Sequence, residues 1–370
     1  WEVMALSSYF LVTTDHDLPE IRRAGFLYLL IAHVGAVSLL LCFGVLQGGE
    51  GDYTFDTMRY AEMTPAWASA AYLLALFGFG AKAGLVPMHV WLPEAHPAAP
   101  SPVSALMSGV MLKTAIYGLL RVTFDLLNVQ IGWWGTLALA LGLVTALYGV
   151  IFAAVQADMK RLLAWSSIEN IGVILAGFGL TLIFHADGKG ALAALTLTAM
   201  LYHALNHAFF KGLLFTGAGA VLHATGERNM NRLGGLMRAM PWTAWLTLVG
   251  ALAIAGLPPL NGFISEWLLL QAFLLTPGLN QPYLNMVIPV AAASVALAAA
   301  LAAYVMVKFF GVTFLGVARS EAVKHAHEAG RRERLGMLWL AAGCVLLGLF
   351  PAQVIAWLAP VVQLLTGQTL

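Results

Sequence analysis

Long, nearly continuous apolar runs recur along the whole chain, and they constrain its fold more than any other feature. Apolar residues make up 60% of the 370 residues and charged residues 10%, whereas a soluble domain carries about 25% charged residues. The runs have the length of membrane-spanning helices, about 20 residues, and not the ten-residue alternation of membrane barrels. Since only helices and closed barrels satisfy the backbone in lipid, the sequence predicts an all-α polytopic membrane protein.

Ten transmembrane helices are predicted from these runs. The chain begins inside an apolar run, without an initiator methionine or a polar leader, so we expect a fragment whose first span is truncated. Proline and glycine interrupt the runs near residues 83–87 and 256–262, which predicts broken helices there. Gly217 and Gly219 are expected to make the helix of the seventh run less rigid. The approximate spans are 1–13, 24–46, 64–86, 102–121, 132–155, 162–183, 191–222, 243–274, 285–316 and 335–365.

The two interruptions have related sequences, AGLVP at 83–87 and AGLPP at 255–259. They lie five spans apart. Because this number is odd, the second copy of the repeat would cross the membrane in the opposite orientation to the first. Broken helices in inverted repeats are typical of transporters, so we predict inverted five-helix repeats. The expected division is 1–121 for the latter part of the first repeat, 132–316 for the second repeat, 317–334 for a basic cytoplasmic loop and 335–370 for an additional C-terminal transmembrane helix.

Charge is unevenly distributed between alternate loops. Twelve of the 19 lysines and arginines, Lys160 and Arg331 among them, fall on one side and three on the other, and the positive-inside rule makes the first side cytoplasmic. The formal net charge of +1 excludes nucleic-acid binding. Cys42 and Cys344 lie in apolar runs without C-x-x-C spacing, so we interpret them as small core residues.

Four lysines lie inside the apolar runs, where an ionisable group costs roughly 3 to 10 kcal/mol or more and usually marks an ion or proton path. Lys82 stands just before the first predicted break, and Lys113 near the middle of its span. Lys211 belongs to the histidine row described next. Lys308 is a secondary candidate, since snorkelling to the cytoplasmic interface explains it equally well.

His203, His207 and Lys211 recur every four residues, which places them on one helix face over about 12 Å. Histidine titrates near neutrality and both donates and accepts protons, so we interpret the row as a relay. Structural hydrogen bonding between helices is the alternative. A metal site is disfavoured, because the row lacks the glutamate of H-E-x-x-H and a third ligand.

Carboxylates are the expected partners of this row. Glu266 follows the second break, where unwound backbone can line a cavity; a helix N-terminal carboxylate is the alternative reading. Glu2 is expected to set the charge state of Lys82, since unit charges about 4 Å apart at an effective dielectric constant near 20 interact by about 4 kcal/mol. Glu169 is a secondary candidate, and His33 is expected to be a core histidine.

The breaks and the polar row lie within distinctive motifs, AAPSPVSALMSG, WSSIENIG, HALNHAFFKG and PPLNGFISEW. These motifs resemble the antiporter-like membrane subunits, a superfamily that includes large membrane subunits of complex I, Mrp-type cation/proton antiporters and membrane-bound nickel–iron hydrogenases. The resemblance extends to about residue 316 and is strongest to the hydrogenase-4 and formate-hydrogenlyase branch. The positions that it matches to the family's proton pathway are Glu2, Lys82, Lys113, His203, His207, Lys211 and Glu266.

The resemblance implies a proton-translocating subunit in the prokaryotic cell (inner) membrane, with no catalytic residue, cofactor or metal of its own. Partner membrane and peripheral subunits would carry nickel–iron (NiFe) and iron–sulfur clusters, and their electron transfer would drive H⁺ movement. Three alternatives stay open. They are an Mrp-type antiporter that exchanges Na⁺ or K⁺ for H⁺ without redox chemistry, a cytochrome with His33 and His203 or His207 as haem ligands, and a degenerate structural subunit.

Overall fold

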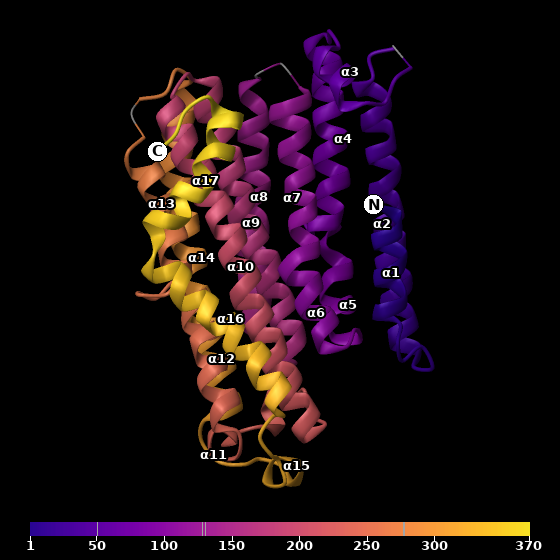
Figure 1. Cartoon of the computed structure of the whole chain (residues 1–370), viewed down its shortest axis with the longest axis vertical. Helices are drawn as coiled ribbons and strands as arrows, with labels where there is room; N and C mark the ends of the chain where they lie inside the picture. Colours follow the sequence, from indigo (N-terminus) through magenta and orange to yellow (C-terminus); the bar gives the residue numbers. More distant parts are fainter. Residues whose placement is uncertain (50, 128, 130, 277) are drawn as a thin grey trace.

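The computed structural model describes residues 1–49, 51–127, 129, 131–276 and 278–370, and its regular elements are helices that form an elongated bundle (Figure 1). The first part of the chain supplies α1 (Glu2–Val12), α2 (Pro19–Leu46), α3 (Phe55–Tyr60), α4 (Pro65–Ala83), α5 (Leu92–Ala98), α6 (Ser101–Leu106) and α7 (Leu112–Leu120). The remainder supplies α8 (Gly132–Val155), α9 (Met159–Ala186), α10 (Gly190–Thr225), α11 (Leu236–Ala239), α12 (Pro241–Ile254), α13 (Asn261–Leu274), α14 (Pro282–Phe314), α15 (Glu321–Lys324), α16 (Arg331–Leu349) and α17 (Pro351–Thr366). Short 3-10 turns at Met88–Trp91 and Met230–Arg232 and π-helical turns at Met107–Met111 and Arg121–Leu126 complete the helical elements.

The predicted all-α, multi-pass architecture is confirmed, although fewer helices than expected have the character of a complete span. In the described part of the chain, six segments are long and apolar enough to cross a membrane, or seven if α16 and α17 count as one bent span. Helices α1 and α12 are apolar but shorter. Helix α10 is 36 residues long and falls outside the set, because its histidines, asparagine and lysine lower its mean hydropathy.

Both predicted helix breaks are present. Helix α4 ends at Ala83 and is followed by Gly84 with φ +83°, and α12 ends at Ile254, two residues before Gly256 with φ +65°. Glycine is the residue that adopts this left-handed conformation without steric cost, and it commonly ends helices. The chain then resumes as helix at α5 and α13.

Two other expectations about helix continuity are wrong. Residues 335–365 do not form one straight helix, because α16 and α17 meet at 87° around Phe350, where Pro351 starts a new helix. Gly217 and Gly219 do not interrupt α10, which is one continuous helix. They allow close packing instead, since a Cβ at these positions would lie 2.3 Å from Thr247 Oγ1 and 2.6 Å from Ser101 Cβ, respectively.

Helix α9 lies at the centre of the bundle, and its most apolar stretch is completely enclosed by protein. Small residues bring the backbones of α8 and α9 together: a Cβ on Gly142 would lie 2.5 Å from Ala176 N, and one on Gly172 would lie 2.3 Å from Ala146 N. Helix α10 packs beside α9, whereas α2 and α14 expose most of their apolar surface. The polar row of α10 is therefore placed next to the most buried helix of the molecule.

Candidate functional site

Lys82 lies in the last turn of α4, beside the first break, and is 2% exposed. Its ammonium donates a hydrogen bond to the hydroxyl of Tyr28 at 3.0 Å. The same nitrogen lies 5.5 Å from the ring centroid of Trp1 and 5.3 Å from that of Tyr28. Aromatic faces stabilise a cation, and more so when it is desolvated, so this pocket can hold a charged lysine without a carboxylate in contact.

The predicted close pair of Glu2 and Lys82 is not formed. Glu2 instead lies 3.4 Å from Nε2 of His33, and no ion pair joins it to Lys82 in the described part of the chain. The side chains of Glu2 and His33 are 44% and 50% exposed, so the prediction of a core histidine at His33 is also wrong. Trp1 occupies the place over the ammonium, and Glu2 acts on Lys82 only through space.

Lys113 and His207 meet across the interface of α7 and α10. The lysine ammonium contacts Nδ1 of His207 and donates to the carbonyl oxygen of Ser108 at 2.6 Å. The π-helical turn Met107–Met111 lies directly before α7, and such turns occur frequently at functional sites. Nε2 of His207 is buried and has no hydrogen-bond partner in the part of the chain that the structure describes. His207 therefore has one ring nitrogen in contact with a lysine and one buried ring nitrogen without a hydrogen-bond partner among the described residues.

His203 connects three helices. Its Nδ1 lies 3.0 Å from the hydroxyl of Ser265 on α13, and its Nε2 lies 3.1 Å from Oδ1 of Asn170 on α9. Asn206 donates to Ser265 at 3.0 Å and to the carbonyl oxygen of Asn261 at 2.7 Å. Because Ser265 belongs to α13, the helix that follows the second break, these hydrogen bonds join α10 to that helix.

Lys211 and Glu169 are both in the protein interior, with exposures of 0% and 3%. Lys211 donates to the carbonyl oxygen of Leu163 at 2.9 Å and interacts electrostatically with Glu169. The amide of Asn170 donates to Glu169. Glu169 was expected to be only a secondary candidate, but its burial and its electrostatic interaction with Lys211 make it part of the same polar cluster.

Glu266 lies beside the second break. Gly256 leaves room for its carboxylate, since a Cβ at that glycine would come within 2.6 Å of Oε2. Helix α13 begins at Asn261, so Glu266 lies beyond its first turn, where the helix dipole acts most strongly. The reading of Glu266 as a simple helix N-terminal carboxylate is therefore disfavoured.

His96 and Lys160 extend the cluster, and sequence reasoning missed both. His96 on α5 is completely buried and stacks on Phe215 with ring centroids 4.8 Å apart. Neither of its ring nitrogens has a hydrogen-bond partner among the described residues. It interacts electrostatically with Lys160 and Lys211. Lys160 was expected in a cytoplasmic loop, but it is 2% exposed and donates to the carbonyl oxygen of Ala99.

Lys308 lies apart from this cluster. Its ammonium donates to the carbonyl oxygens of Ala154 and Gln156, both at 2.7 Å, where α8 ends. A cation is favoured at a helix C-terminus, which has unpaired carbonyl groups and the negative end of the dipole. The structure thus gives Lys308 a structural explanation.

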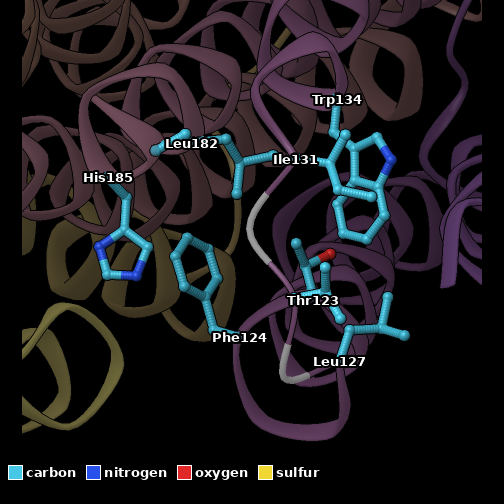
Figure 2. A pocket seen from close by; sticks show the side chains of 9 residues that line it. Thr123, Phe124, Leu127, Ile131, Trp134, Leu182 and His185 are labelled. Atoms are coloured by element: carbon cyan, nitrogen blue, oxygen red, sulfur yellow. The ribbon is translucent and has the colours of Figure 1, made fainter. Parts of the chain in front are cut away.

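A cavity of about 210 Å³ lies near the start of α8 and the end of α9 (Figure 2). Phe124, Leu182 and Trp134 form its apolar walls, and Thr123 and His185 add polar atoms. None of the buried lysines or glutamates lines it. Within the described ranges, no group of three or more histidine, cysteine, aspartate or glutamate side chains is arranged to hold a metal ion.

Comparison with known proteins identifies the family of this chain. Residues 1–287 match the family model described as "NADH:quinone oxidoreductase/Mrp antiporter, TM". The chain belongs to this family. The match covers both helix breaks and the complete polar row, and it confirms the superfamily that the sequence motifs predicted.

Individual relatives refine the comparison. Hydrogenase-4 component B of Escherichia coli K12 is 45% identical over 97% of this chain and 53% of its own length. Formate hydrogenlyase subunit 3 of the same organism is 36% identical over 98% and 58%. A chain in the structure of the Mrp complex from Dietzia sp. DQ12-45-1b superposes with a TM-score of 0.84 at 28% identity, covering all of this chain and 38% of that one. The chain spans about half the length of the curated relatives that it matches.

Proposed function

We propose that this family member is a proton-translocating membrane subunit of a redox complex of the hydrogenase-4 or formate-hydrogenlyase type, in a prokaryotic cell membrane. One observation carries the proposal. Titratable side chains lie in the protein interior at and between the two helix breaks: Lys82, His207 and Lys211 are at most 2% exposed, and Lys113 and Glu266 are half-buried. Desolvated ionisable groups are costly in a membrane protein and usually serve transport, and the 45% identity to hydrogenase-4 component B supports the type of complex.

The proton path would use the contacts in the middle of the row. Lys113 contacts Nδ1 of His207, so a proton on the lysine can move to that nitrogen while another leaves from the open Nε2. Lys211 and His203 lie on the same face of α10 as His207 and are the nearest acceptors along the helix. Glu266, next to Ser265, would take the proton at the second break.

His96 would continue the path on the side of Lys160. A buried imidazole with two unpartnered nitrogens is suited to accept and pass on a proton, and it feels the charges of both neighbouring lysines. Glu2 would act on Lys82 at a distance, while the rings of Trp1 and Tyr28 lie beside the ammonium. Electron transfer in partner subunits that carry nickel–iron and iron–sulfur clusters would drive these charge changes.

The repeat division belongs to the proposal as well. We assign 1–121 to the latter part of the first inverted repeat and 132–316 to the second, followed by the basic loop 317–334 and the additional C-terminal transmembrane segment 335–370. The similar position of a left-handed glycine at each break, Gly84 and Gly256, supports this assignment.

The experiment that tests the function uses inside-out vesicles that contain the complete complex. We expect His207→Phe to abolish acidification driven by the redox reaction while electron transfer continues uncoupled or slowed. Lys308→Met is the matched control, because Lys308 caps α8 and lies outside the row. Undiminished acidification with His207→Phe would rule out the path.

An Mrp-type cation/proton antiporter is the second candidate, supported by the likeness to a chain of the Mrp complex. It predicts that added Na⁺ or K⁺ collapses a preformed pH gradient in vesicles without any electron donor. The redox-driven function predicts no cation response under those conditions.

A further inference from the structure

A cleft of about 270 Å³ lies between the first turns of α12 and α16, at the end of the bundle that holds α11 and α15 (Figure 1). This end carries the excess of basic residues, and the positive-inside rule makes it cytoplasmic. Two arginines and four apolar side chains line the cleft. They are Arg331, Arg334, Trp242, Leu246, Leu335 and Leu338.

The arginines are unusually placed for a helix. Arg331, Arg332 and Arg334 occupy the beginning of α16, which is the positive end of the helix dipole and disfavours cations. Arg331 and Arg334 are three residues apart and line the same cleft, which Arg332 does not line. Arg331 also borders a neighbouring cleft, together with Arg332 and Glu333. An anion between Arg331 and Arg334 would offset this concentration of positive charge.

The nearby acidic side chains do not supply that anion. Glu328 accepts hydrogen bonds from the backbone of Trp242 at 2.7 Å and from the hydroxyl of Thr243 at 2.6 Å, so it caps α12. Glu333 lies 3.7 Å from His223. In the part of the chain that the structure describes, no ion pair involves the cleft arginines, and the buried Nε of Arg334 has no hydrogen-bond partner.

The apolar part of the cleft is exposed on the surface of the chain. Trp242 is 57% exposed and Leu335 65%, while the buried Leu246 forms the floor. Tryptophan is enriched at the membrane interface, at the level of the lipid headgroups. The cleft thus presents positive charge at headgroup level and an apolar surface directly below it.

We propose that this cleft binds an anionic phospholipid of the cytoplasmic leaflet. Its phosphate lies between Arg331 and Arg334, and one acyl chain follows Leu335 and Leu338 beneath the ring of Trp242. Basic pockets between helices on the cytoplasmic side are suited to such headgroups. This site is separate from the proton path and does not depend on it.

The test uses the full chain in detergent, titrated with phosphatidylglycerol and, in parallel, phosphatidylcholine, with bound lipid counted by native mass spectrometry. We expect one tight phosphatidylglycerol site, and Arg331→Gln combined with Arg334→Gln should weaken it by roughly tenfold. Arg332→Gln, the matched control on the same helical turn, should leave it unchanged. Arg331→Lys combined with Arg334→Lys should keep most of the affinity for phosphatidylglycerol, because both side chains remain positively charged.

Several results would overturn the proposal. Equal loss with Arg332→Gln would mean diffuse attraction to the whole basic end, and equal binding of phosphatidylcholine would mean an apolar groove only. Displacement of the lipid by millimolar inorganic phosphate would mean a site for a soluble anion, and a co-purified protein seated there would mean a subunit interface. If Arg331→Gln combined with Arg334→Gln lowers the thermal midpoint, the affinity is measured with Arg331→Gln alone, because Arg331 is exposed. Unchanged affinity in this single variant would also contradict the proposal.

Discussion

The two broken helices use the same backbone feature but hold opposite charges. At each break a helix ends just before a glycine in the left-handed conformation, Gly84 after α4 and Gly256 after α12. At the first break the ionisable residue, Lys82, precedes the glycine by two residues. At the second, Glu266 follows the glycine by ten residues, on the next helix.

The surroundings of the two charges differ in a way that matches their chemistry. Lys82 has a hydroxyl acceptor and two aromatic rings, which stabilise a cation. Glu266 lies against the bare Cα of Gly256, in a space that a side chain there would fill. The comparison indicates that the two breaks share the backbone feature at which a helix ends, whereas the packing around each break decides which ionisable side chain it accommodates.

Of the changes at the two breaks, the largest expected effect comes from removing the charge at the first. Lys82→Met should lower redox-driven proton uptake in inside-out vesicles by more than about tenfold, because the row loses its terminal carrier. Lys308→Met should retain near-normal uptake. If both variants behave alike, Lys82 has no special role.

Changing the charge at the second break should have a smaller effect that depends on the replacement. Glu266→Gln removes the titratable group and should lower proton uptake several-fold, whereas Glu266→Lys should retain part of it, because a lysine also carries a proton. The measurement is the initial rate of dye quenching in the same vesicles. Equal rates for the two variants would show that titration at this position is not required.

Substituting alanine for the glycine at each break distinguishes the effect of backbone strain from the effect on the neighbouring ionisable residue. Gly84→Ala and Gly256→Ala should each destabilise the protein by about 1–2 kcal/mol, since alanine is strained at these φ values. Only Gly256→Ala should also impair proton uptake strongly, because its Cβ would meet the Glu266 carboxylate at 2.6 Å, while at Gly84 the Cβ meets the movable end of Leu92 at 2.7 Å.

Thermal midpoints in detergent measure the stability part of this prediction. Combining Gly256→Ala with Glu266→Ala should relieve the contact and leave only the backbone strain. Additive losses of stability in the double variant would contradict a direct clash between the two residues.

The smallest expected effect is at Tyr28. Tyr28→Phe keeps the aromatic face near Lys82 but removes the hydroxyl that accepts its hydrogen bond. A loss of about 1 kcal/mol in stability and about a twofold change in proton uptake is expected. Tyr28→Leu, which also removes the ring, should be worse; if it matches Tyr28→Phe, the ring contributes nothing to holding the lysine.

Several features were determined by the sequence alone, because they depend on local chemistry. Apolar runs of membrane length specify helices through the backbone's need for hydrogen bonds in lipid, and proline with glycine ends them near residues 87 and 256. The four-residue spacing of His203, His207 and Lys211 places them on one face of a helix whatever surrounds it. These predictions all held in the structure.

Only the tertiary structure decided which charges meet. Glu2 contacts His33 and not Lys82, and Lys113 contacts His207 from 94 positions away in the chain. The packing of α5 and α9 buries His96 and Lys160, although both stand in segments that look like loops. Such contacts depend on the rotation and tilt of each helix against its neighbours, which are set by close packing at small residues and not by any local pattern.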